Sequence, residues 1–331
     1  MNKISILDCT LREGGYVNDW LFGKKNIRHI CRSLSLSGIE FIECGFLKNS
    51  NYDKDKSLYN SLELLKPIIR DLNSKFCLMI NYGEIDFIPE NQYGNIYFRV
   101  AFRKPDRLKA INYCKKLHDK GYKIFINSMT SSSYSDDELK KLIEQINVIE
   151  PYAYTISDTL GCMNSEEIIR QFSIADKNLS HDIKLGFHSH NNMQLAFSNS
   201  QLFLEQQTNR DLIIDSTLMG IGRGAGNLST EMIARYLNFK NGKDYDIDLI
   251  LKTIEDKIQP IYNDNPWGYS IPYYISALNC CHPNYAKYLT ENTNISYEDM
   301  NKILKLIPIE KKIVFDIETI EQLFLDFKNN L

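Results

Sequence analysis

Residues 4–16 read Ile4-Ser5-Ile6-Leu7-Asp8-Cys9-Thr10-Leu11-Arg12-Glu13-Gly14-Gly15-Tyr16. The first four residues are a short, mostly apolar run, which is typical of a buried parallel strand. Charged residues follow directly, and charges at the end of a buried strand are costly unless they pair or bind a cation. The two glycines that come next stop the strand and let the backbone turn. The stretch therefore predicts a buried strand that ends in a salt bridge or a functional site.

The rest of the chain alternates short apolar runs with stretches that have helical spacing. The expected strands are residues 4–7, 40–46, 76–80, 96–102, 123–127, 153–157, 183–188 and 212–215. The expected helices are residues 24–37, 56–72, 105–120, 136–148, 165–176, 193–206 and 229–237. Ser135, Gly38 and Gly121 are the expected helix-capping residues.

This pattern has the count and length of a (β/α)8 TIM barrel, so we predict an α/β fold. The barrel is expected at residues 1–240 as the catalytic domain, and a mainly helical extension at residues 241–331 is expected to pack on it. An open, doubly wound sheet is the alternative. It usually needs fewer units, and no Gly-rich phosphate-binding turn follows the first strand.

Composition narrows the classes of function. The formal net charge of −3 gives no reason to expect nucleic acid or an anionic membrane as a partner. No run approaches the ~18 apolar residues of a membrane span, and the N-terminus lacks a signal-peptide pattern. The 8 cysteines are scattered, as expected of reduced thiols. We therefore expect a cytoplasmic protein that acts on small molecules.

The seventh predicted strand ends in Gly186-Phe187-His188-Ser189-His190-Asn191-Asn192. The side-chain period of a strand is two, so His188 and His190 point the same way. In a TIM barrel, functional side chains gather at the carboxyl ends of the strands, where Glu13 also lies. Two imidazoles that face a carboxylate form a divalent-metal site, whereas a lone histidine is more often a core residue.

Other polar side chains are also assigned to the carboxyl ends of predicted strands. These are Glu43 for the second strand, Arg103 for the fourth, Asn127 for the fifth, and Asp158 and Thr159 for the sixth. The eighth strand precedes a glycine-rich loop, residues 220–227, whose backbone can approach a ligand closely. Asn227 ends this loop as either a helix N-cap or an oxygen ligand. The loop lacks the Lys-Ser/Thr ending of a P-loop.

Together these motifs resemble those of the DRE-TIM metallolyase superfamily, which includes HMG-CoA lyase, isopropylmalate and homocitrate synthases, and 4-hydroxy-2-oxovalerate aldolase. The matching segments are residues 8–14, 42–46, 188–192 and 222–227, in the right strand order. The resemblance implies that Glu13 binds the metal, where most members have Asp, together with His188, His190 and Asn227. Mn²⁺ or Mg²⁺ is the expected metal, with Zn²⁺ as the alternative.

The resemblance also implies roles beyond the metal. Arg12 would stabilise the enolate oxygen of a 2-oxo substrate, and Glu43 would hold Arg12 in place. Residues 267–276 weakly resemble a Gly-Tyr-x-x-x-Tyr segment of the hydroxy-oxovalerate aldolases, in which Tyr273 matches an active-site tyrosine. Aromatic packing of the extension is the alternative for this residue. Those aldolases have a histidine base at the position of Tyr16. The expected substrate-binding residues are Arg103, Asn127, Thr159 and Arg223.

We therefore predict a divalent-metal-dependent aldolase-type lyase that acts on a 2-oxo acid through pyruvate enolate chemistry, with an aldehyde as the second small-molecule substrate. Gly14-Gly15-Tyr16 differs from the Gly-Glu-Gln that follows the motif acid in isopropylmalate and homocitrate synthases. A Claisen-type, acyl-CoA-dependent acyltransferase and a non-catalytic barrel subunit stay open as alternatives. The expected assembly is a homodimer or a complex with a partner dehydrogenase.

Overall fold

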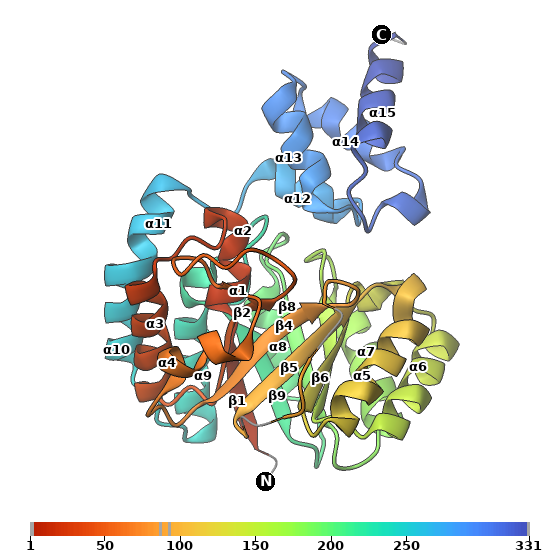
Figure 1. Cartoon of the computed structure of the whole chain (residues 1–331). Helices are drawn as coiled ribbons and strands as arrows, with labels where there is room; N and C mark the ends of the chain where they lie inside the picture. Colours follow the sequence, from red (N-terminus) through yellow and green to blue (C-terminus); the bar gives the residue numbers. More distant parts are fainter. Residues whose placement is uncertain (1–2, 86–87, 92–93, 330–331) are drawn as a thin grey trace.

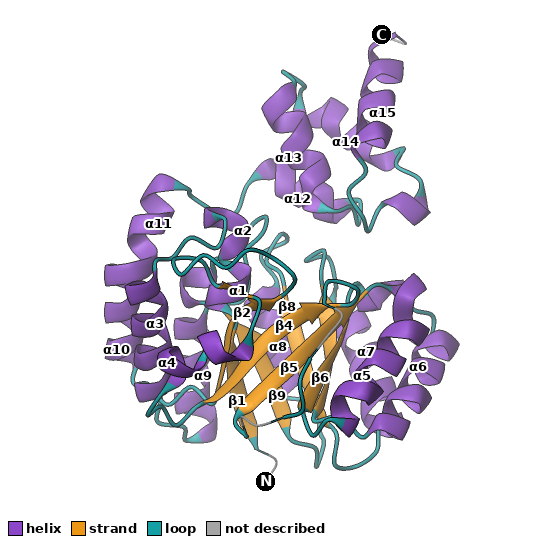
Figure 2. Ribbon diagram, in the orientation of Figure 1, coloured by secondary structure: helices purple, strands orange, loops and turns teal. Residues whose placement is uncertain are grey.

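The computed structural model describes residues 3–85, 88–91 and 94–329. Eight parallel strands form a closed barrel (Figures 1 and 2). They are β1 (Ile4–Asp8), β2 (Phe41–Leu47), β4 (Lys75–Asn81), β5 (Ile96–Phe102), β6 (Lys123–Ser128), β7 (Ala153–Asp158), β8 (Lys184–Ser189) and β9 (Leu212–Ser216). Strand β1 pairs with both β2 and β9, which closes the barrel. The predicted TIM barrel is confirmed.

Helices surround the strands (Figure 2). They are α3 (Lys24–Leu36), α4 (Lys66–Ile69), α5 (Arg107–Asp119), α6 (Asp136–Ile149), α7 (Ser165–Asn178), α8 (Ala196–Leu204) and α9 (Thr230–Asn241). Particular residues determine where several of these helices begin or end. Ser135 and Glu138 form a reciprocal capping box at the start of α6. Gly38 and Gly121 have φ angles of +89° and +82° just after α3 and α5, where a left-handed residue ends a helix.

The predicted helix over residues 56–72 is wrong in its first part. Leu58–Tyr59 forms a short strand, β3, that pairs with Phe46 and Leu47 of β2. A turn of 3-10 helix, η1 (Leu62–Leu64), follows before α4. Pro67 lies in the first turn of α4, where its missing N–H is tolerated. The proline explains why a helix begins here and does not run through residue 67, and pairing with β2 explains the strand at Leu58–Tyr59.

The residues after α9 pack in two groups. Helices α10 (Ile247–Thr253) and α11 (Gln259–Asp264), with the π-helical turn η5 (Ile254–Ile258) between them, add apolar side chains to the barrel's hydrophobic core. Helices α12 (Ile271–Leu278), α13 (Pro283–Asn292), α14 (Tyr297–Lys305) and α15 (Ile317–Asn329) enclose a separate hydrophobic cluster. We call this second group the cap, because Figure 1 shows it above the carboxyl ends of the strands. The domain boundary between residues 240 and 241 stays a prediction.

Aromatic rings fill the amino end of the barrel. Phe41, Tyr97, Phe125 and Tyr152 contact one another edge-on or tilted, with ring centroids between 5.1 and 6.1 Å apart. The ammonium group of Lys184 lies 4.3 Å from the ring centroid of Tyr152. Aromatic and cation–π contacts of this kind fill the amino end of the barrel with side chains that pack against one another. Across the described residues, no helix combines the length and the apolar character needed to cross a membrane.

Candidate metal centre and active site

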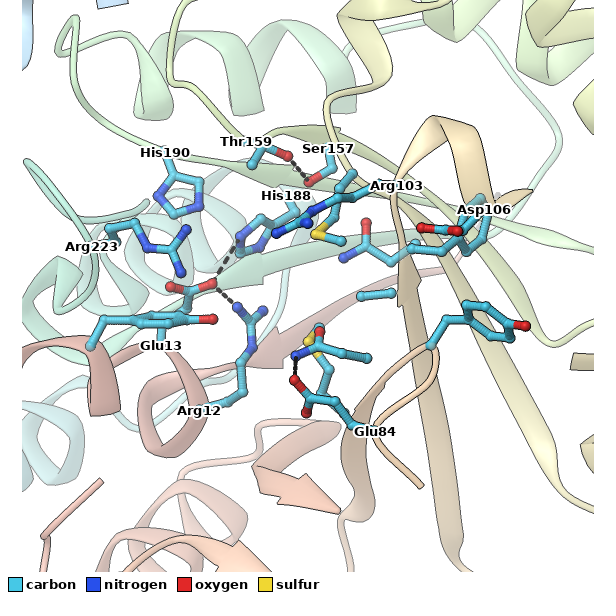
Figure 3. A pocket seen from close by; sticks show the side chains of 18 residues that line it. Arg12, Glu13, Glu84, Arg103, Asp106, Ser157, Thr159, His188, His190 and Arg223 are labelled. Carbon is cyan, nitrogen blue, oxygen red and sulfur yellow. Dashed lines mark hydrogen bonds and ion pairs between the residues drawn. The ribbon is translucent and has the colours of Figure 1, made fainter. Parts of the chain in front are cut away.

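Strand β1 runs directly into a one-turn helix, α1 (Thr10–Glu13). Asp8 holds this turn: its carboxylate accepts hydrogen bonds from the Thr10 amide at 2.9 Å and from the Thr230 hydroxyl at 2.6 Å. Burial raises the pKa of Asp8 to about 6. The turn directs Arg12 and Glu13 toward the carboxyl end of the barrel, as Figure 3 shows.

The two glycines after α1 provide space rather than the expected turn. Gly14 has a right-handed helical φ of −62°, and Gly15 begins the short helix α2 (Gly15–Asn18). A Cβ atom on Gly15 would lie 2.1 Å from the Trp20 ring. The Trp20 indole N–H donates to the backbone oxygen of Arg12 at 3.0 Å. Gly15 therefore lets Trp20 pack against the turn that carries Arg12.

Three buried side chains converge at this end of the barrel: Glu13, His188 and His190. Their ligand atoms all lie within 4.8 Å of one another. His188 Nε2 is 3.4 Å from Glu13 Oε1, and the two imidazole rings stand nearly perpendicular with centroids 5.1 Å apart. Burial lowers the pKa of both histidines, that of His190 further than that of His188. Both rings are therefore neutral near pH 7, the form that binds a metal ion.

Asn227 lies beside this group. It forms a β-bridge with His190, and its side-chain N–H donates to the Ile221 carbonyl at 3.1 Å. Its side-chain oxygen and the Oε2 atom of Glu13 are buried and have no hydrogen-bond partner within the described part of the chain. A Cβ atom on Gly222 would lie 2.0 Å from the Asn227 amide and 3.4 Å from Glu13 Oε2. Two unpartnered oxygens beside two neutral imidazoles fit a divalent cation.

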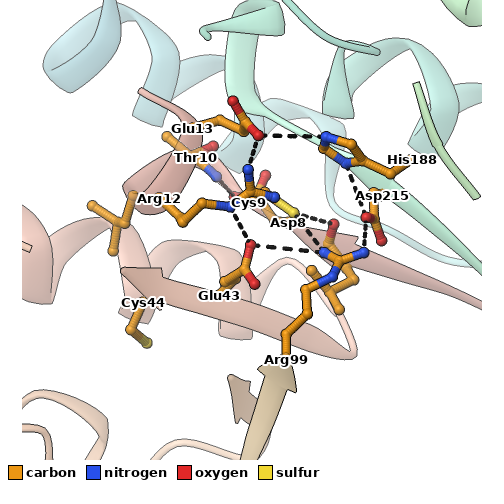
Figure 4. A network of polar contacts seen from close by, with 12 residues as sticks. Asp8, Cys9, Thr10, Arg12, Glu13, Glu43, Cys44, Arg99, His188 and Asp215 are labelled. Carbon is orange, nitrogen blue, oxygen red and sulfur yellow. Dashed lines mark hydrogen bonds and ion pairs between the residues drawn. The ribbon is translucent and has the colours of Figure 1, made fainter. Parts of the chain in front are cut away.

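Buried charges hold the donors in place (Figure 4). Arg12 forms an ion pair with Glu13, and its Nε donates to Glu43 Oε2 at 2.7 Å. Glu43 is fully buried behind Arg12. A planar guanidinium held at one edge by a carboxylate has a fixed orientation. One terminal nitrogen of Arg12 has no hydrogen-bond partner among the described residues, so it is free to meet a ligand.

Two further residues, Arg99 and Asp215, complete this network and were not predicted from the sequence. Asp215 forms an ion pair with Arg99 and lies 3.0 Å from Nδ1 of His188. Burial acts to raise the pKa of Asp215, but Arg99 and His188 outweigh it and lower this pKa, so the carboxylate is ionised. Its bond to Nδ1 leaves Nε2 of His188 facing Glu13. The available signal was Arg99 itself, a charge inside an otherwise apolar strand.

Glu13, His188 and His190, which we call the metal group, open into a cavity of about 330 Å³ (Figure 3). The predicted site residues that line it are Arg12, Glu13, Tyr16, Arg103, Asn127, Thr159, His188, His190 and Arg223. Polar residues that were not predicted also line it: Asn81, Tyr82, Glu84, Asp106 and Ser157. The cavity therefore brings together side chains from the carboxyl ends of most strands of the barrel.

Three predicted residues lie outside this lining. Glu43 is behind Arg12, and Asn227 lies beside the metal group. Tyr273 is half-buried on α12, and the described residues that surround the cavity do not include it. Burial and the Glu291 carboxylate raise the pKa of Tyr273. The catalytic role of Tyr273 and its packing alternative both stay predictions.

The cap reaches the site through a different residue, His282. Arg223 donates a hydrogen bond to Nε2 of His282 at 3.0 Å. The guanidinium carbon of Arg223 lies 3.9 Å from the ring centroid of Tyr16. Burial, and then the charge of Arg223, lower the pKa of His282 to about 3.

Asp158 stabilises the loop after β7. Its carboxylate accepts hydrogen bonds from the Cys162 and Met163 amides at 3.0 and 3.2 Å.

A closed (β/α)8 barrel with one carboxylate, two histidines and a fixed arginine at its carboxyl end defines a class of metal-binding TIM barrels. Residues 103–256 match the family model described as HMGL-like. These residues therefore belong to an HMGL-like (DRE-TIM) domain, and the resemblance predicted from the motifs is confirmed.

Known proteins agree with this assignment. Over 270 residues the chain is 26% identical to a protein of Bacillus thuringiensis (strain Al Hakam) named 4-hydroxy-2-oxovalerate aldolase, covering 78% of this chain and 76% of that protein. The solved N-terminal domain of an aldolase candidate from Bacteroides vulgatus has a TM-score of 0.76 and 26% identity, covering 87% of this chain and 97% of that one. HMG-CoA lyase from Brucella melitensis shares the fold, with a TM-score of 0.63, 15% identity, and coverage of 80% and 100%.

Proposed function

We propose that this protein is a divalent-metal-dependent aldolase that makes or breaks a carbon–carbon bond beside a 2-oxo acid, with pyruvate as the partner that forms the enolate. The observation that best supports this proposal is the group of Glu13, His188 and His190. Their ligand atoms lie within 4.8 Å of one another, and Arg12 forms an ion pair with Glu13. Similarity to relatives named 4-hydroxy-2-oxovalerate aldolase supports the reaction class.

Glu13, His188, His190 and Asn227 would hold the cation. A cation bound by them would supply Lewis acidity to a substrate carbonyl oxygen. Two of the four donors are oxygens, and no thiolate takes part. This donor set favours Mn²⁺ or Mg²⁺ over Zn²⁺.

Arg12 would stabilise the negative charge that develops on the 2-oxo oxygen when the neighbouring carbon–hydrogen or carbon–carbon bond breaks. Its unpartnered terminal nitrogen is available for that oxygen, and Glu43 keeps the guanidinium oriented. A preoriented cationic donor in a buried site is effective because it does not have to reorganise during the reaction.

Tyr16 is the proposed proton relay. Tyr16 belongs to the cavity lining, at the position where related aldolases carry histidine. Arg223 lies over the Tyr16 ring and hydrogen-bonds His282, which ties the tyrosine's surroundings to the cap. In cleavage the relay takes the proton of a 4-hydroxyl group, and in bond formation it returns that proton to the aldehyde oxygen.

The cavity favours this reading over an acyl-CoA-dependent acyltransferase. Its volume of about 330 Å³ is at the small end for a ligand site. Glu84 and Asp106 also line it and offset the charges of Arg103 and Arg223, so the cavity is not the strongly basic pocket that the phosphates of coenzyme A call for.

The test is exchange of the pyruvate methyl protons in deuterated water, followed by NMR. We expect exchange that requires added Mn²⁺ or Mg²⁺ and no acyl-CoA, and that weakens in Tyr16→Phe. The His188→Ala, His190→Ala double variant is the negative control. Unlabelled pyruvate, together with release of free thiol from acetyl-CoA and a 2-oxo acid, would replace the aldolase proposal with the acyltransferase.

A further inference from the structure

The cavity has two chemically different sides, and its second side bears on the aldehyde substrate. Figure 3 shows Glu13, His190 and Arg223 together on one side, with Glu84 and Asp106 on the opposite side. The metal and the pyruvate unit occupy the first side under the proposed function, on which this inference rests. The second side is therefore left for the aldehyde.

Asn127 is the decisive residue of the cavity wall. It lies near the carboxyl end of β6, in register with Ala101 of β5 and Thr155 of β7, and only 3% of its surface is exposed. Its side chain lines the cavity, and its amide oxygen has no hydrogen-bond partner among the residues that the structure describes. A buried acceptor left unpaired is costly, so this oxygen is suited to a donor on a ligand.

The opposite side adds more acceptors. Glu84 follows β4, and one of its carboxylate oxygens accepts a hydrogen bond from the Asn81 side chain at 3.1 Å, which fixes the carboxylate. Asp106 ends the 3-10 turn η2 (Lys104–Asp106) after β5 and also lines the cavity. Ionised carboxylates only accept hydrogen bonds.

These groups discriminate between classes of aldehyde. A plain alkyl chain would leave the buried Asn127 oxygen facing carbon atoms, which gives it no partner. A phosphate or carboxylate at the far end of the aldehyde would meet Glu84 and Asp106 as well as Arg103, and the two carboxylates outnumber that one cation. Hydroxyl groups donate hydrogen bonds without adding charge, so they match both the acceptors and the local charge.

We propose that the aldehyde partner is a neutral, polyhydroxylated aldehyde whose hydroxyl groups donate to Asn127, Glu84 and Asp106. In the direction of bond formation, the pyruvate methyl group gives up one proton and its carbon bonds to the aldehyde carbon. The aldehyde oxygen takes up one proton and becomes the 4-hydroxyl. The product is a 2-oxo acid with a hydroxylated tail, and no oxidant or reductant is consumed.

The test compares three aldehydes with the same three-carbon skeleton: propionaldehyde, glyceraldehyde and glyceraldehyde 3-phosphate. Each is incubated with pyruvate and the Mn²⁺-loaded full-length protein, and the adduct is quantified by mass spectrometry. We expect kcat/KM for glyceraldehyde to exceed that for either other aldehyde by at least about 10-fold. Asn127→Leu should shrink the preference for glyceraldehyde over propionaldehyde. Asn263→Leu, at an exposed position on α11, is the matched control that should keep it.

A second variant probes the charge argument. Glu84→Gln combined with Asp106→Asn removes both negative charges, so kcat/KM for glyceraldehyde 3-phosphate should rise relative to that for glyceraldehyde. Pyruvate proton exchange is measured in the same samples. Exchange with a preference for propionaldehyde or glyceraldehyde 3-phosphate overturns the substrate class alone. Absence of exchange in the metal-loaded wild-type protein overturns the proposed function, and the substrate class with it.

Discussion

The two ends of the barrel use the same eight strands in opposite ways. At the amino end, the rings of Phe41, Tyr97, Phe125 and Tyr152 pack against one another. At the carboxyl end many of the buried side chains are charged or polar, and Glu13 and its neighbours form the candidate metal site. The first end is closed by apolar contacts, whereas the second encloses a cavity.

The two ends of the barrel differ in whether their buried groups find partners within the protein. The aromatic side chains at the amino end pack against one another. At the carboxyl end, buried oxygens of Glu13, Asn127 and Asn227 have no hydrogen-bond partner among the described residues. Unpaired buried polar atoms lower the stability of a fold, so an end that collects them is better explained by binding than by folding. Substitutions at the two ends should therefore separate activity from stability.

The largest effect on activity is expected from removing both imidazoles of the metal group. His188→Ala with His190→Ala takes away two of four proposed ligands, so bound metal should be lost and turnover should fall by about 1,000-fold or more. Metal analysis of protein purified without chelator is the measurement, and circular dichroism checks that the barrel remains folded. Full metal content in the double variant would show that the site lies elsewhere.

Arg12→Lys should have the next largest effect. Lysine keeps the positive charge but loses the planar donor that Glu43 orients, so turnover should fall by ~100-fold while metal content stays the same. Steady-state kinetics and metal analysis on the same preparation check both parts. Near-normal turnover would mean that Arg12 serves only as a strand-end salt bridge.

A smaller effect is expected for Asp215→Asn, and β9 supplies its own control. Asp215 orients His188, so the amide should weaken metal affinity by ~10-fold, as measured by competition with a metal indicator. Asp211 lies just before the amino end of the same strand, where it accepts a hydrogen bond from the Lys3 amide at 2.9 Å. Asp211→Asn should leave metal affinity unchanged. Equal losses in both variants would contradict the orienting role of Asp215.

The sequence predicts the parts of the site that depend on local geometry. The spacing of His188 and His190 follows from the two-residue period of a strand, and the carboxyl-end rule for barrels brings Glu13 to them. Asn81 stands at the end of β4 and lines the cavity, so the same rule would have found it. Both are consequences of the strand itself.

Other features depend on packing between distant segments, which sequence patterns do not encode. Arg99 and Asp215 pair across 116 positions, and the contact of Arg223 with His282 joins the barrel to the cap. The weak match that selected Tyr273 does not encode where α12 lies relative to the cavity. The wrong prediction of a helix at residues 56–72 has the same cause, because pairing with β2 makes Leu58–Tyr59 a strand.

The smallest effect on turnover is expected for Phe125→Ala at the amino end. Phe125 is fully buried and contacts Phe41, Tyr97 and Tyr152. Truncation leaves a cavity among these rings, so the free energy of unfolding should fall by about 3–5 kcal/mol. Turnover per folded molecule should change by less than ~2-fold, because Phe125 lies among the rings that close the far end of the barrel. Urea unfolding gives the first quantity, and initial rates well below the melting temperature give the second. A large loss of turnover at unchanged metal content would mean that the two ends are coupled, and that the aromatic cluster helps to position β6 and Asn127.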